Sequence, residues 1–314
     1  MSRLNSNMHP LLNGIVLNAL FDKKIYNVIQ FVETEIKQIA AITNLQYKNI
    51  VEIRKHLINK YSAITNNGLD YYNELITKSA LFSTGIKSLD AILEGGLMTG
   101  NVYEICGLPA SGKTQFCLSL LKHVAQKFNF NSYYIDTKRD FSAKRLKVML
   151  DESKYEKADL EQVMSKILIN EINTPYELIN YLYKIKNLLH VKKLKLRLII
   201  IDSLPPLFLQ ISNFSKSYSL MNDFANVMRF LAKEFHIAFV VVNVKTVWNE
   251  GDFGVEGNVT EKLGLGKYWF NVPNTRLMIK KCTRSSDCTI TILKSNRLAK
   301  GLQCSVGISD AGVV

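Results

Sequence analysis

The sequence has no apolar run long enough to cross a membrane, no low-complexity segment and no internal repeat. Its longest apolar stretches, such as Leu198–Ile201, predict buried strands instead. The first residues, Met1–Asn5, hold no apolar core of the kind found in secretory leaders. The five cysteines are odd in number and lack zinc-ligand spacing, which favours ordinary buried thiols in a reducing compartment.

Acidic residues are few relative to basic ones. The chain holds 40 Lys and Arg against 27 Asp and Glu, which gives a formal net charge of +13. A charge of this sign and size favours contact with a polyanion, nucleic acid above all. A basic protein that binds no nucleic acid is the alternative, because such folds are common.

The 314 residues are enough for one large domain and one small one. We expect a small helical domain over residues 1–62, a linker over 63–81 and an α/β core over 82–314. A turn signal precedes Asp70–Leu75, where a short helix is expected. The linker is either a plain connector or a segment that docks a partner protein.

Two stretches of the N-terminal region carry apolar residues at helical spacing. They are Lys24–Ala40 and Tyr47–Tyr61. Asn44 lies in the break between them, where asparagine can adopt the left-handed conformation that glycine often takes. The pattern therefore predicts two long helices joined by a tight turn.

From Phe82 onward, apolar strand patterns alternate with helical ones, as at Ser219–Phe235. This alternation predicts a mostly parallel, twisted sheet with helices on both faces. Two later runs predict strands that close the far edge of the sheet. The expected strands are Ser132–Asp136, Lys166–Ile172, Arg197–Asp202, Ile237–Val244, Thr275–Lys281 and Cys288–Lys294.

Residues 107–114 fit the phosphate-binding loop pattern, in which two spaced glycines are followed by Lys and Ser or Thr. The glycines allow backbone N–H groups to point at phosphate oxygens. A strand is expected before the loop at Val102–Cys106 and a helix after it at Gln115–Phe128, the order that adds a helix dipole to the anion site. The predicted nucleotide-binding residues are Gly107, Leu108, Pro109, Ala110, Ser111, Gly112, Lys113, Thr114 and Gln115.

A second nucleotide signal is the aliphatic run that ends in Asp202. A buried parallel strand that ends in Asp places its carboxylate at the nucleotide crevice. There Asp202 would hold Mg²⁺ directly or through water, together with the hydroxyl of Thr114. The alternative is a carboxylate that merely caps a helix or a turn.

With these motifs, the chain resembles the RecA/RadA-like strand-exchange recombinases, and within them the eukaryotic paralogues of the recombinase, most closely the D type. The resemblance covers nearly the whole chain. The matching segments are Phe82–Asp90, Gly107–Gln115, Ile135–Thr137, Lys144–Leu146 and Ile200–Ser203, with Asn67–Leu75 and Leu265–Arg276 similar to the D type.

The resemblance implies a RecA-type P-loop ATPase core with ATP and Mg²⁺ as cofactors. It implies a nuclear protein of DNA repair and recombination, active on DNA damage and in meiosis, that assembles with other paralogues, binds single-stranded DNA and contacts the main recombinase transiently. Arg145 matches an arginine of the family that stacks on adenine. A surface arginine is the alternative at this position.

Two departures from the family concern catalysis. The strand-exchange members have a glutamate that orients or deprotonates the attacking water, and Lys138 stands there in this chain. A cation cannot accept a proton from water. They also have a glutamine that senses the γ-phosphate, where this chain has Val244. Asp136 and Asp140 are carboxylates near Lys138, but the sequence does not place either one.

The family's two DNA-contacting loops correspond to residues 205–219 and 245–266. The second carries Glu250, Asp252, Glu256 and Glu261, which repel phosphates. The aromatic residues of the two loops either stack on bases or pack inside the protein. They are Phe208, Phe214, Trp248 and Phe253. Basic residues concentrate in two other runs, which are Lys184, Lys186, Lys192, Lys193, Lys195 and Arg197, and Lys138, Arg139, Lys144, Arg145 and Lys147. The run at 184–197 is either a solvated helix face or a phosphate-binding patch.

These signals favour an ATP-binding recombination mediator that uses ATP to shape an interface, with slow turnover. The first alternative is an autonomous DNA-dependent ATPase that performs strand exchange, against which Lys138 and Val244 argue. The second is a P-loop phosphotransferase, for which the sequence lacks an arginine-rich lid.

Overall fold

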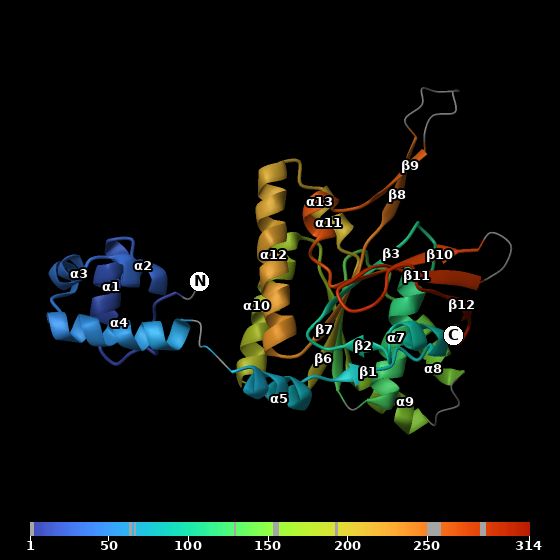
Figure 1. Cartoon of the computed structure of the whole chain (residues 1–314), viewed down its shortest axis with the longest axis horizontal. Helices are drawn as coiled ribbons and strands as arrows, with labels where there is room; N and C mark the ends of the chain where they lie inside the picture. The colour runs from blue at the N-terminus through green and yellow to red at the C-terminus, as the bar shows by residue number, and fades with distance from the viewer. Residues whose placement is uncertain are drawn as a thin grey trace. The chain divides into compact units, whose positions relative to one another are not determined.

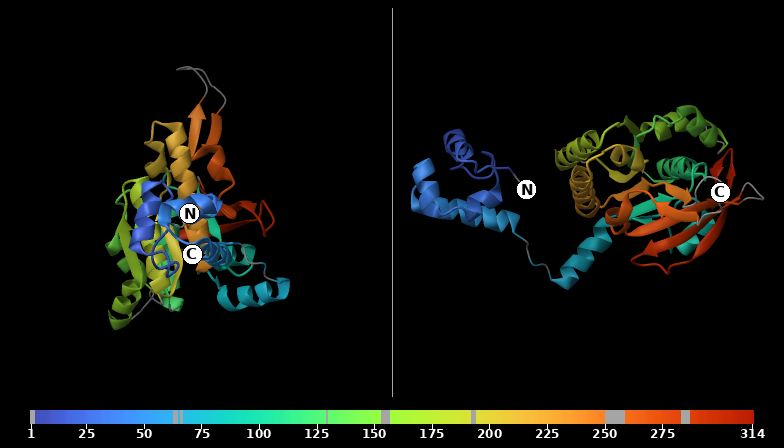
Figure 2. Two further views of the ribbon diagram at one scale, coloured as in Figure 1. Left: turned by 90° about the vertical axis from the view of Figure 1, so that its left-hand side faces the viewer. Right: turned by 90° about the horizontal axis from the view of Figure 1, so that it is seen from above.

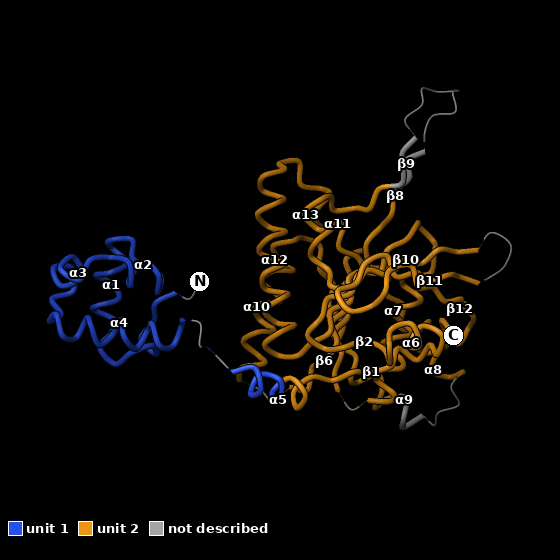
Figure 3. Tube along the Cα trace, viewed as in Figure 1, with its two compact units in different colours: residues 1–74 blue, residues 75–314 orange. Residues whose placement is uncertain are grey.

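The computed structural model describes residues 3–62, 65, 67–128, 130–152, 157–191, 194–249, 259–282 and 287–314. The chain forms two compact units, Met1–Glu74 and Leu75–Val314, drawn separately in Figure 3. The division lies inside the segment expected as a linker, residues 63–81. The finer boundaries given by the sequence pattern stay predictions.

In the described part of the N-terminal unit, helices α1 to α4 pack around one apolar core (Figure 1). Its core side chains come from every helix and from the segment before them, and include Leu12, Leu20, Phe31, Ile39 and Ile50, each fully buried. The helices are α1 (Gly14–Asp22), α2 (Val28–Glu33), α3 (Ile36–Thr43) and α4 (Tyr47–Tyr61).

The prediction of one helix over Lys24–Ala40 is wrong, because α2 and α3 are separate. Asn27 and Gln30 form a reciprocal capping box that starts α2. At the other end Thr34 turns extended, and its hydroxyl donates to the Gln30 carbonyl at 2.6 Å. The predicted helix at Tyr47–Tyr61 is confirmed, and Asn44 adopts the expected left-handed conformation with a φ of 54°.

Helix α5 (Gly68–Lys78) occupies most of the expected linker. Asn67 caps it, since its side-chain oxygen accepts from the Asp70 N–H at 2.8 Å. None of its residues is buried. The short helix expected at Asp70–Leu75 is therefore present and longer than predicted.

The larger unit is built on a nine-stranded sheet with the order β13-β12-β11-β10-β3-β7-β6-β4-β5. The six strands from β10 to β5 are parallel, and β11 to β13 add an antiparallel edge. The strands are β3 (Val102–Cys106), β4 (Asn131–Asp136), β5 (Ile167–Glu171), β6 (Leu196–Asp202), β7 (Ala238–Val242), β10 (Thr275–Lys281), β11 (Asp287–Ser295), β12 (Gln303–Ser309) and β13 (Gly312–Val313).

Helices cover both faces of this sheet (Figure 2). Alternation along β6 shows why: Leu198 and Ile200 pack into one apolar cluster, while Ile199 and Ile201 pack into the other. The first face carries α6 (Lys87–Ile92), α7 (Lys113–Lys127), α8 (Ala143–Asp151) and α9 (Lys157–Ser165); the second carries α10 (Pro175–Val191), α11 (Pro205–Leu209), α12 (Phe214–Glu234) and α13 (Gly266–Phe270). The expected α/β class is confirmed.

The larger unit also contains two small antiparallel sheets in its described part. One pairs β1 (Leu81–Phe82) with β2 (Leu97–Met98), and the other, a hairpin, pairs β8 (Lys245–Asn249) with β9 (Val259–Leu263). Among the residues described, no helix has the length and apolar character needed to span a bilayer.

Candidate nucleotide-binding site

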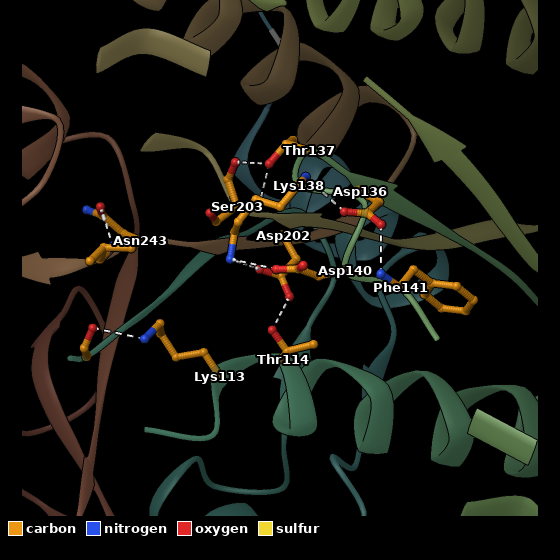
Figure 4. Close-up of polar contacts among 12 residues, drawn as sticks. Lys113, Thr114, Asp136, Thr137, Lys138, Asp140, Phe141, Asp202, Ser203 and Asn243 are labelled. Carbon is orange, nitrogen blue, oxygen red and sulfur yellow. Dashed lines mark hydrogen bonds and ion pairs between the residues drawn. The ribbon is translucent and has the colours of Figure 1, made fainter. Parts of the chain in front are cut away.

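The phosphate loop joins β3 to α7 at the edge of the sheet where the parallel strands end (Figure 4). Strand β3 is buried along its whole length, which fixes where the loop starts. Helix α7 begins at Lys113, so its first N–H groups face the loop. The strand, loop and helix therefore follow in the order that phosphate binding requires.

Two glycines let this loop pack closely on neighbouring strands. A Cβ at Gly107 would lie 2.4 Å from the carbonyl oxygen of Ile279 on β10. Gly112 has a φ of +96°, and a Cβ there would lie 2.5 Å from the Ile308 side chain on β12. Any larger residue at Gly107 would push the loop away from β10.

The ammonium of Lys113 is folded into the loop it follows. Its Nζ donates to the carbonyls of Gly107 at 3.0 Å and Leu108 at 2.6 Å and to the Ser111 hydroxyl at 3.3 Å. Burial, and next the nearby charge of Lys138, lower the pKa of Lys113, while Asp202 raises it. A buried ammonium held only by neutral acceptors is well suited to an incoming phosphate.

Thr114 and Asp202 meet across the site. The Thr114 hydroxyl donates to Asp202 Oδ2 at 2.7 Å, and the Tyr134 hydroxyl donates to the same oxygen at 2.9 Å. Asp202 is 2% exposed, and its Oδ1 has no hydrogen-bond partner among the residues described. The Thr114 hydroxyl oxygen and the buried Asp202 carboxylate, whose Oδ1 has no such partner, are a donor set that fits Mg²⁺.

Lys138 faces that oxygen of Asp202. Its Nζ lies 3.9 Å from Asp202 Oδ1 and 3.6 Å from Asp140 Oδ2. Asp136 points elsewhere, because its two oxygens accept the N–H groups of Lys138 at 3.0 Å and Phe141 at 2.8 Å. Of the two carboxylates that the sequence left unplaced, only Asp140 reaches the site.

A cavity of about 800 Å³ opens beside these groups. Residues 109–115 of the predicted nucleotide-binding loop line it, together with Lys138, Asp140, Asp202 and Val244. Gly107 and Leu108 instead line a neighbouring cavity of about 370 Å³. Sequence reasoning missed Leu209, Lys281 and Ile308 in the first cavity. Leu209 ends α11, shortly after Asp202, whereas Lys281 on β10 and Ile308 on β12 are far from both motifs in sequence.

Arg145 lies outside the lining of this cavity. Its guanidinium donates to Gln115 at 3.0 Å, to the Ser309 carbonyl at 2.7 Å and to the Asp310 carbonyl at 3.0 Å. These bonds tie α8 to the C-terminal strands and to the end of the phosphate loop. Stacking of Arg145 on an adenine stays a prediction.

A buried polar network joins β3, which leads into the phosphate loop, to its neighbours in the sheet. The Glu104 carboxylate on β3 accepts from Asn243 Nδ2 at 2.6 Å and pairs with Arg276 on β10. Glu104 is fully buried and Arg276 is 1% exposed. Burial raises the pKa of Glu104, and the Arg276 charge opposes that rise. The network links β3 and β10 to Asn243, the residue that follows β7.

The chain after β7 touches the phosphate loop through its backbone. Val244, where the family's glutamine was expected, lines the cavity with an aliphatic side chain. The next residue, Lys245, donates its backbone N–H to the Gly107 carbonyl at 3.0 Å. The hairpin that Lys245 begins is therefore bonded to the loop without a sensing side chain.

The predicted DNA-contacting segments are only partly described. Residues 205–219 are largely helical, with Phe208 buried at 2% and Phe214 exposed at 83%. Phe208 is therefore a packing residue. The side chains of Trp248, Phe253, Glu250, Asp252, Glu256 and Glu261 lie outside the described residues, as do Lys192 and Lys193.

The basic run at 184–197 has intramolecular partners at two of its described positions. Lys186 places its Nζ 4.2 Å from the centre of the Phe230 ring. Arg197 donates to the backbone carbonyls of Phe235 at 3.4 Å and His236 at 3.1 Å. These contacts favour a structural use of both cations.

Comparison with known proteins gives two family matches. The Rad51 family matches residues 77–314, and the family described as "RAD51D, N-terminal domain" matches residues 1–59. Together they match most of both units of the chain, and residues 60–76 lie between the two matches.

Individual relatives agree with these matches. A bovine (Bos taurus) protein named DNA repair protein RAD51 homolog 4 is 29% identical, over 99% of this chain and 97% of its own. DNA repair and recombination protein RadB of Pyrococcus furiosus is 27% identical over 58% of this chain and 74% of its own. A crystal structure of the RadB recombinase shares the fold, with a TM-score of 0.60 and 21% identity, over 74% of this chain and 98% of that one.

Proposed function

The chain belongs to the Rad51 family, and we propose that it is an ATP-binding mediator of homologous recombination that joins other paralogues on single-stranded DNA. Its N-terminal match to the RAD51D domain and its relatives named as DNA repair proteins support a role as a D-type recombinase paralogue. Contact with the main recombinase, a meiotic role and a nuclear location stay predictions.

The observation that carries the nucleotide part of this proposal is the meeting of Thr114 and Asp202 beside the phosphate loop. They are 88 residues apart in sequence, yet the hydroxyl and carboxylate lie at 2.7 Å. Lys113 would bind the β- and γ-phosphates, and Thr114 with Asp202 would hold Mg²⁺, which neutralises phosphate charge when bound. Loop N–H groups would orient the triphosphate.

Within the described part of the chain, this site has no carboxylate at the position of the glutamate that activates water in strand-exchange recombinases. Lys138 carries a positive charge where a carboxylate would be needed, and Val244 offers no hydrogen bond. We therefore propose that ATP serves mainly as a ligand that shapes an interface. Single-turnover assays of ATP hydrolysis, with and without single-stranded DNA, test this; turnover matching an active recombinase would contradict it.

Replacing Asp140 by asparagine is expected to change residual hydrolysis by less than about fivefold. Asp140 is 63% exposed and its nearest charge is Lys138, so its carboxylate is neither desolvated nor aimed by a hydrogen bond. The same single-turnover assay measures this effect, with Asp151→Asn on α8 as the matched exposed control. A loss of a hundredfold would make Asp140 the general base.

ATP is expected to tighten assembly with a paralogue by at least about fivefold, the lower end of typical coupling between two sites. Co-purification and titration with candidate paralogues, with and without ATP, measure it. The Lys113→Ala variant is expected to assemble equally in both conditions. Homogeneous filaments of this chain alone on single-stranded DNA would instead support an autonomous strand-exchange ATPase.

A further inference from the structure

Lys138 is held in the site by the turn from which it projects. The Thr137 hydroxyl donates to the Ser203 carbonyl at 2.6 Å and accepts from the Ser203 N–H at 2.8 Å. On the other side Asp136 accepts the Lys138 N–H. These bonds join the turn after β4 to the end of β6, so the Lys138 backbone is fixed beside Asp202 (Figure 4).

The ammonium of Lys138 then lies between two carboxylates. It is 3.9 Å from Asp202 Oδ1, the buried oxygen that lacks a hydrogen bond among the described residues, and 3.6 Å from Asp140. The side chain is 35% exposed, against 69% for its neighbour Arg139. Lys138 also lines the cavity next to the phosphate loop, whereas Arg139 does not.

A positive charge at this place has a specific consequence for a nucleotide. A triphosphate without metal is repelled by the Asp202 carboxylate, and Mg²⁺ ordinarily removes that repulsion. Here the Lys138 ammonium already lies 3.9 Å from Asp202 Oδ1, and Lys138 lines the same cavity as Lys113. A metal ion near Asp202 must share the carboxylate with this ammonium.

We propose that Lys138 is a built-in cation that allows the site to bind a nucleoside triphosphate in its metal-free form. This inference rests on the proposed nucleotide binding and deepens it, because it assigns a role to the residue that replaces the expected glutamate. Lys138 thereby substitutes charge stabilisation of the bound nucleotide for activation of water.

The test is the affinity for ATP of the full chain, titrated calorimetrically with Mg²⁺ and again with EDTA. We expect the wild-type dissociation constants in the two buffers to lie within about tenfold of each other. The dissociation constant in EDTA divided by that in Mg²⁺ should be at least about tenfold larger in Lys138→Met than in the wild type. In Lys138→Glu this ratio should be larger still.

Arg139→Met is the matched control. It removes the same charge one residue away, from a side chain that pairs with Glu171 at 3.5 Å outside the cavity. Its ratio should equal that of the wild type, and circular dichroism should show that all variants are folded. A general effect of net charge would shift the ratio equally in both variants and would overturn the proposal.

Two further outcomes separate this inference from the proposed function. If the wild-type chain and Lys138→Met both bind ATP only in the presence of Mg²⁺, the proposed role of Lys138 is wrong, while the proposed nucleotide binding is supported. If folded wild-type protein binds ATP in neither buffer, both are wrong. The proposal is supported if the ratio of the two ATP dissociation constants is small in the wild type and larger only in the Lys138 variants.

Discussion

Replacement of Lys113 by alanine is expected to weaken ATP binding by at least about thirtyfold. Lys113 is 8% exposed, and its ammonium is held by two loop carbonyls and one hydroxyl, all at 3.3 Å or less. Removing one member of a buried charge pair costs about 2–5 kcal/mol, which is a factor of about thirty or more in affinity. Calorimetric titration of ATP in Mg²⁺ buffer measures it.

Two variants make this test specific. Lys122→Ala removes a lysine from the same helix, α7, whose ammonium donates to the Ala311 carbonyl at 2.8 Å outside the cavity, so ATP affinity should be kept. Lys113→Arg keeps the charge but presents a planar fork to a cradle built for a compact ammonium, so affinity should still fall. Wild-type affinity in Lys113→Ala would refute the assignment of the phosphate loop.

Replacement of Arg276 by methionine is expected to lower the free energy of unfolding of the core unit by about 3–5 kcal/mol. The change leaves the Glu104 carboxylate, which is fully buried, with Asn243 but without a counter-charge. Urea unfolding measures it, followed by the fluorescence of Trp269, which is buried on α13 and stacks on Phe224 at 5.9 Å.

The pH dependence gives an independent check on this variant. Burial already raises the pKa of Glu104, and loss of the Arg276 charge must raise it further. A carboxyl whose folded-state pKa is raised stabilises the fold while protonated, and this stability is lost as pH rises. The Arg276→Met variant should therefore recover part of its stability as the pH is lowered from neutrality towards the ordinary pKa of glutamate.

A double variant separates the ion pair from simple packing. In Glu104→Gln with Arg276→Met neither charge of this ion pair is left, and the glutamine oxygen still accepts from Asn243. We expect its destabilisation to be smaller than that of Arg276→Met alone. If the double variant instead loses as much unfolding free energy as Arg276→Met, or more, Arg276 acts through its volume and through its contact with the Phe270 ring, 4.7 Å away.

The regular elements were largely predictable because each depends on local periodicity. The predicted strands at Val102–Cys106 and Thr275–Lys281 coincide with β3 and β10, whose apolar residues are buried on the sheet. The break at Thr34 was missed because Asn27 and Gln30 cap a helix inside an unbroken apolar pattern. Strands β12 and β13 were missed because they alternate weakly at an edge.

The phosphate loop can be recognised from local sequence alone, since Gly107, Gly112 and Lys113 act through backbone freedom and charge within one short segment. The local sequence also shows that a carboxylate ends the strand at Asp202. The folded chain was needed to show that Thr114 bonds Asp202, that Lys138 faces the other Asp202 oxygen, and that Arg276 pairs with Glu104. Those pairs depend on the order of the strands, and that order is set by burying both faces of one sheet, which no local pattern contains.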